Sequence, residues 1–177
     1  LRVIRVVIPR GVSGLGSVAS RSWRANYGWR CGLDSRSEVM MDTDALVRQR
    51  VAEYFTTGDY NCAMTVLKVL GEVFDVHLEA QVIAAGRCMP GAGGVEGLCG
   101  LVSGTLMFIG VWGAHHGVSR QTLRPISTSF SQGVQQRFGN ILCRDLRLNG
   151  CSKLAVDVLN FTILHLSEQM DRILYRK

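Results

Sequence analysis

Cysteines are the residues of this sequence whose number and spacing suggest chemistry. The chain has six of them among 177 residues, and Cys31 lies in an arginine-containing stretch near its N-terminus. No two form a C-x-x-C pair, and no C-x-x-C-H haem-attachment site is present, so local spacing predicts neither a zinc ribbon nor a thioredoxin. A shared site must therefore be assembled by the fold from cysteines far apart in sequence, which are Cys62, Cys88, Cys99, Cys143 and Cys151.

Four of these cysteines are expected at or near the starts of helices. Cys62 opens a helical segment, and Cys99 stands between a glycine-rich stretch and an apolar one. The unpaired N–H groups at a helix N-terminus stabilise a thiolate, so we expect both thiols to have a lowered pKa and to act as nucleophiles or metal ligands. Cys143 and Cys151 lie on either side of a turn containing Gly150, and all four could converge at one end of a bundle. Free cysteines also serve simply as small buried apolar residues, which is the alternative.

The glycine-rich stretch "GRCMPGAGGVEG", residues 86–97, looks like a phosphate-binding loop but lacks what such a loop needs. A Walker loop requires G-K-[ST] after its glycines, whereas Gly100 and Leu101 follow Cys99 here. A dinucleotide-binding loop requires a preceding strand, and residues 78–85 have a helical pattern. We therefore interpret the glycines as a flexible approach that places Cys99 at a helix start.

Other functional classes find less support. His115 and His116 could ligate a metal, but adjacent histidines at the end of a helix more often interact with solvent or the helix dipole. The carboxylates are scattered, and no pair suggests acid–base hydrolysis. Residues 1–40 hold seven arginines and two acids, whereas residues 41–177 hold thirteen basic and twelve acidic residues. This balance predicts no nucleic-acid partner.

The spacing of apolar residues predicts an all-α fold, a compact single-domain bundle of five or six helices. The segment over about 98–113 is apolar all round and is expected to be the central helix, with Gly100, Ser103 and Gly104 admitting a neighbouring backbone. It is too short for a membrane span, so no transmembrane segment is predicted. Two helices are expected before it, the first capped by Asp42, Thr43 or Asp44 and the second by Asp59 or Asn61, and a third, shorter one covers 78–85. A further helix ends at Gly139, and Pro125 falls in its first turn if it starts near Leu123 or Arg124. The last expected helix covers about 152–175.

Residues 1–40 show no sustained period and are expected to lie outside the folded domain, which is assigned to residues 41–177. Three origins stay open: an over-extended reading frame with the start at Met40 or Met41, a transit peptide, or a disordered basic tail. The domain itself is expected in the cytoplasm.

Four segments taken in order resemble a known family. They are "GDYNCAMTVL" with Cys62, "LCGLVSGTLMFIG" with Cys99, "FGNILCRDL" with Cys143 and "NGCSKLAVDVL" with Cys151. Together they are similar to the redox-active family named for its cysteine pattern, C_GCAxxG_C_C, over roughly residues 44–170. The chain departs from that pattern at Leu101, where the family has alanine, and at Cys88 and Pro90 within the glycine run.

The resemblance implies a redox protein in which four cysteines form one thiol/disulfide centre, served by a redox partner of unknown identity. A second reading is an iron–sulfur cluster or other metal bound by the same cysteines, with Cys88 as an additional ligand and Gly100 and Gly104 beside the cofactor. A third is a helical interaction or transport-accessory module whose cysteines are only packed. The apolar central helix could also pack across a homodimer. The residues concerned in the first two readings are Cys62, Cys99, Cys143 and Cys151.

Overall fold

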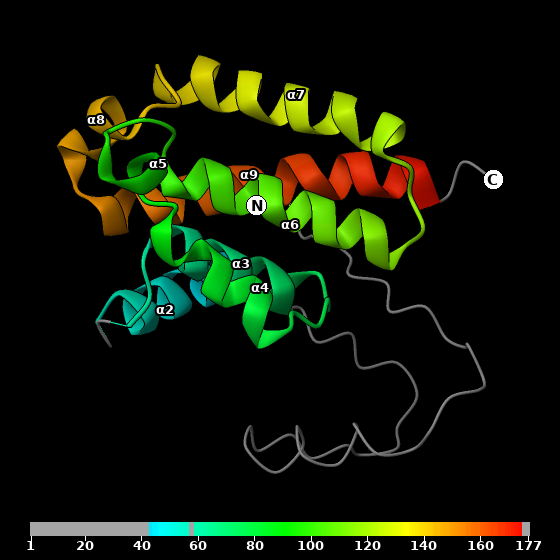
Figure 1. Ribbon diagram of the computed structural model, residues 1–177, viewed down its shortest axis with the longest axis horizontal. Coiled ribbons are helices and arrows are strands. Elements are labelled where there is room, and N and C mark those ends of the chain that lie inside the picture. The colour runs from blue at the N-terminus through cyan, green and yellow to red at the C-terminus, as the bar shows by residue number, and fades with distance from the viewer. Residues whose placement is uncertain (1–42, 57–58, 175–177) are drawn as a thin grey trace, which may run out of the picture.

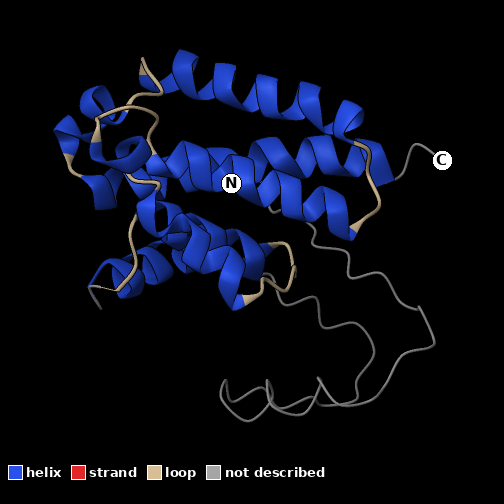
Figure 2. Cartoon of the chain, viewed as in Figure 1, coloured by secondary structure: helices blue, strands red, loops and turns tan. Residues whose placement is uncertain are grey.

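The computed structural model describes residues 43–56 and 59–174, which are almost entirely helical (Figures 1 and 2). Five long helices build the bundle: α2 (Thr43–Thr56), α3 (Cys62–Val73), α6 (Gly100–His115), α7 (Arg120–Phe138) and α9 (Cys151–Leu174). Shorter pieces connect them: α4 (Ala80–Ala85), η1 (Gly86–Cys88), α5 (Gly91–Gly94), α8 (Cys143–Leu146) and η2 (Arg147–Asn149). The described residues contain no strand beyond a single bridge, so the all-α prediction is confirmed. The predictions for residues 1–40 lie outside the described residues.

Helix α6 is central, as its apolar sequence predicts. It packs against α3, α7 and α9, and Figure 1 shows it lying between α7 on one side and α3 on the other. Its buried side chains include Leu101, Val102, Phe108, Ile109 and Trp112. Within the described part of the chain, no helix combines the length and the apolar character needed to cross a bilayer.

Helix α7 begins earlier than the position of its proline suggests. Ser119 caps it by accepting a hydrogen bond from the backbone N–H of Thr122 at 3.2 Å, so the helix starts at Arg120. Pro125 therefore lies inside the helix, and the expected start near Leu123 or Arg124, which would have placed it in the first turn, was wrong. The capping serine is the stronger start signal here, while Pro125 is exposed and removes only one backbone donor from the helix.

The glycine-rich stretch contains a left-handed turn rather than an ordinary loop. Four consecutive residues, Gly91 to Gly94, have positive φ angles of 59°, 54°, 84° and 86°. Residues with a Cβ pay a steric penalty in this region, which explains why three of the four are glycine. The fourth is Ala92, and the turn leads the chain into the start of α6.

Candidate thiol site

Four cysteines mark helix starts, as the sequence predicts. Cys62 is the first residue of α3, Cys143 of α8 and Cys151 of α9, while Cys99 is the N-cap of α6. Figure 1 shows the starts of α6 and α9 at the same end of the bundle as α5 and α8. The topology therefore brings segments more than fifty residues apart in sequence to one end of the fold.

Asn61 positions the start of α3. Its side-chain oxygen accepts hydrogen bonds from the backbone N–H groups of Ala63 at 3.0 Å and Met64 at 3.1 Å. Its amide nitrogen donates to the carbonyl oxygens of Gly86 at 3.1 Å and Arg87 at 2.9 Å. One side chain thus caps the helix that carries Cys62 and also ties η1 to it. The capping role was foreseeable from sequence, but the bonds to η1 were not.

Gly100 and Gly104 let α6 approach α3 closely. A Cβ added to Gly100 would lie 2.2 Å from the sulfur of Cys62, and one added to Gly104 would lie 2.6 Å from the carbonyl oxygen of Ala63. Both distances are shorter than real contacts allow. The sulfur of Cys62 therefore lies directly against the backbone at the start of α6, and these glycines are the residues that admit it.

A short antiparallel bridge brings Cys99 and Cys143 together. Leu98 pairs with Leu142, the N–H of Cys99 donates to the carbonyl of Ile141 at 2.9 Å, and that of Cys143 donates to the carbonyl of Gly97 at 2.7 Å. The bridge therefore holds the backbone of Cys99, at the start of α6, beside that of Cys143, at the start of α8. The ion pair between Arg147 and Glu96 joins the same two segments a few residues further out.

The pKa values of two thiols, Cys62 and Cys99, are raised. The pKa of Cys62 is raised to about 12, first by burial and then by the charges of Cys99, Cys151 and Cys143. The pKa of Cys99 is also raised, first by burial, while backbone N–H groups of α6 lower it and the charges of Cys143 and Cys151 raise it. In both cases burial is the first cause of the raised pKa, and the charges of other motif cysteines add to it.

The expectation of lowered pKa values for Cys62 and Cys99 was wrong. Helix N-terminal N–H groups do act on both sulfurs, at Ala63 for Cys62 and at Leu101 and Val102 for Cys99. Removal of the thiolate from water is the larger effect, because a buried charge loses more solvation than these few hydrogen bonds return. Both thiols are protonated at neutral pH.

Exposure divides the four cysteines. Cys99 is buried, with 4% of its surface exposed, and Cys62 and Cys143 are partly buried. Cys151 is exposed at the start of α9. A reagent or partner arriving from solvent would therefore meet Cys151 first.

Two sequence candidates differ from this group. Cys88 is exposed at the end of η1 rather than at the start of an α-helix. His115 and His116 lie at the far end of α6, roughly 24 Å along a sixteen-residue helix from Cys99. Their rings contact each other, and His116 also contacts Trp112.

A preformed metal site does not fit this arrangement. Among the described residues, no three His, Cys, Asp or Glu side chains are placed so that together they could hold a metal ion. All five described cysteines are free thiols, which suits thiol–disulfide chemistry.

Comparison with known proteins agrees with the cysteine pattern. The family model described as "Putative redox-active protein (C_GCAxxG_C_C)" matches residues 60–163, a segment that begins just before Cys62 and includes Cys151. No curated protein and no solved structure matches the chain.

Proposed function

Because the chain belongs to the C_GCAxxG_C_C family of redox-active proteins, we propose that its four motif cysteines act as one thiol/disulfide centre. The observation that carries this proposal is geometric: the sulfur of Cys62 lies against Gly100, directly after Cys99, and the bridge between Leu98 and Leu142 places the backbone of Cys99 beside that of Cys143. The raised pKa of Cys62, to which the charges of Cys99, Cys151 and Cys143 contribute after burial, is consistent with this grouping. The centre consists of Cys62, Cys99, Cys143 and Cys151.

The difference in exposure suggests the order of reaction. The thiolate of exposed Cys151 attacks a partner's disulfide, forming a mixed disulfide and releasing one partner thiolate. A second cysteine of the centre then attacks the sulfur of Cys151 and releases the second partner thiolate. The centre loses two electrons and two protons, and the partner disulfide gains them. The reverse sequence reduces the centre.

The raised pKa of Cys62 suits a thiol that reacts second. While Cys151 is an anion, its charge disfavours ionisation of Cys62. Conversion of Cys151 to a mixed disulfide removes this smaller contribution to the raised pKa of Cys62, whose first cause, burial, remains. Before that step, the buried and protonated thiol is protected from stray oxidants. Because a centre of free thiols is maintained in a reducing compartment, we also propose a cytoplasmic location.

The test is a thiol titration on protein purified without oxygen, before and after exposure to glutathione disulfide. We expect thiols to be lost in pairs and recovered with dithiothreitol, with the new disulfides located among the four motif cysteines by peptide mass spectrometry. If the purified protein instead contains stoichiometric iron, sulfide or zinc and its thiols are protected, the four cysteines bind a metal and the thiol/disulfide proposal is wrong. Inert thiols in a metal-free protein would leave only the structural role.

A matched pair of variants tests the role of Cys151. Both Cys151 and Cys88 are exposed, but Cys151 begins α9 and belongs to the family's cysteine pattern, whereas Cys88 ends η1 and does not. In the Cys151→Ser variant, glutathione disulfide should oxidise the remaining thiols much more slowly than in the unaltered protein. In the Cys88→Ser variant, the rate of oxidation should be unchanged. If oxidation slowed equally in both variants, Cys151 would not be the cysteine that reacts first.

A further inference from the structure

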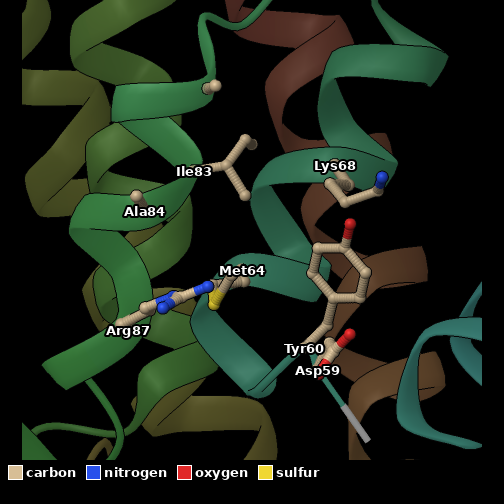
Figure 3. A pocket seen from close by; sticks show the side chains of 8 residues that line it. Asp59, Tyr60, Met64, Lys68, Ile83, Ala84 and Arg87 are labelled. Atoms are coloured by element: carbon tan, nitrogen blue, oxygen red, sulfur yellow. The ribbon is translucent and has the colours of Figure 1, made fainter. Parts of the chain in front are cut away.

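A pocket of about 430 Å³ lies between the start of α3 and the segment formed by α4 and η1. Figure 3 shows its two walls, with Ile83, Ala84 and Arg87 on one side and Tyr60 and Lys68 on the other. Its volume is in the range of small-molecule sites. None of the four motif cysteines lines it, so it is separate from the thiol centre.

Two cations line this pocket without a carboxylate partner among the described residues. The ammonium of Lys68 lies 4.6 Å from the ring centres of both Tyr54 and Tyr60, which stabilises the charge but leaves its N–H donors without an anion. Arg87 carries a planar guanidinium, which suits the two oxygens of a carboxylate. One acid, Asp59, also lines the pocket. The three groups together carry one net positive charge.

The rest of the lining is apolar. Met64 and Ile83 contribute flexible hydrophobic surface, Ala80 and Ala84 keep the α4 wall small, and Tyr60 contributes an aromatic face. A ligand with charged groups along its whole length would place polar atoms against this apolar surface, which is unfavourable. A ligand with one anionic end and an apolar body would satisfy both parts of the lining.

The wall that carries Arg87 is held in place before any ligand arrives. The side chain of Asn61 donates hydrogen bonds to the carbonyls of Gly86 and Arg87, and Gly86 packs so closely on α3 that an added Cβ would lie 3.1 Å from the Cγ of Met64. A fixed wall reduces the entropy lost on binding.

From these observations we propose that the pocket binds a small organic carboxylate with an apolar body. Lys68 and Arg87 hold the carboxylate, and Met64, Ile83 and Tyr60 contact the body. The single net positive charge favours a singly charged ligand over a doubly charged phosphate. The proposal goes beyond the redox function and does not depend on it.

The experiment titrates the full chain with three probes that share one body, namely octanoate, 1-octanol and octylammonium, followed by calorimetry and by the NMR signals of the methionine methyl groups. We expect octanoate to bind saturably and to shift the Met64 signal, octanol to bind at least tenfold more weakly and octylammonium not to bind. Lys68→Met and Arg87→Gln should each weaken octanoate binding roughly tenfold or more, since each removes a charge-assisted contact. Asp59→Asn should strengthen it, because a repelling charge is lost.

Matched controls separate a specific site from general attraction to a basic protein. Lys153→Met and Arg120→Gln remove exposed cations elsewhere and should leave octanoate affinity unchanged. Circular dichroism checks that each variant is folded. Equal binding of octanol and octanoate, equal weakening by a control variant, or no saturable binding to the unaltered protein would overturn the proposal. Thiol titration of the same samples tests the redox centre independently.

Discussion

The sulfur of Cys62 lies against the backbone of Gly100, so closely that a Cβ at position 100 would be 2.2 Å from it. This contact joins the start of α3 to the start of α6, and it brings together two of the four cysteines of the proposed centre, because Cys99 directly precedes Gly100. The geometry of the centre therefore depends on a residue that has no side chain.

Gly100→Ala should displace the side chain of Cys62 and destabilise the fold. Overpacking of this kind costs about 1–3 kcal/mol in the free energy of unfolding. The measurement is urea denaturation together with the alkylation rate of Cys62, which should rise as its sulfur is displaced. Gly110→Ala on the same helix is the control, because its added Cβ meets nothing within 4 Å, and it should stabilise by up to about 1 kcal/mol. Equal effects of the two substitutions would show that the contact at position 100 is unimportant.

The stability of the protein should fall at alkaline pH in a way that depends on Cys62. Its pKa is raised from 9.0 to about 12, so the unfolded chain loses its proton first as the pH rises. The contribution to stability is complete below pH 9 and is lost progressively between about pH 9 and pH 12. Denaturation of the unaltered protein and of Cys62→Ala across this range should show a smaller loss in the variant. Identical pH profiles would mean that the thiol is not shielded from water.

Asn61 should contribute twice, through its cap and through its bonds to η1. Asn61→Asp keeps an oxygen for the N–H groups of Ala63 and Met64 but loses both donors to the carbonyls of Gly86 and Arg87. Asn61→Ala loses the cap as well, at a further cost of about 1 kcal/mol. Thermal denaturation should therefore rank the unaltered protein above Asn61→Asp and Asn61→Ala last. Faster hydrogen exchange in residues 86–88 of both variants would identify the lost tie to η1, and unchanged exchange would contradict it.

The left-handed turn before α6 predicts opposite effects for two neighbouring substitutions. Ala92→Gly should stabilise the protein by about 1 kcal/mol, because Ala92 has a φ of 54° that glycine adopts without a steric penalty. Gly93→Ala should destabilise by a similar amount, since its φ is 84° although no atom would obstruct the new Cβ. The midpoints of chemical denaturation of the two variants, compared with that of the unaltered protein, measure both effects. The same sign for both would contradict the left-handed conformation.

Local features of the sequence were enough to predict the helical class, the order of the helices and the cysteines at their starts. Capping residues and apolar periodicity act within a few residues, so Asn61 before Cys62 and the apolar run after Cys99 indicate their helices without knowledge of the rest of the chain. The order of the cysteines also indicated the family, which the match over residues 60–163 confirms.

Only the tertiary structure decided how the thiols behave. The sequence placed Cys62 and Cys99 at helix N-termini, which favours a thiolate, but burial by neighbouring helices raises their pKa instead. Likewise, the bridge between Leu98 and Leu142 joins segments too far apart for any local pattern to predict. Desolvation and long-range pairing depend on which surfaces meet, and that is determined by the packing of the whole chain rather than by any one segment.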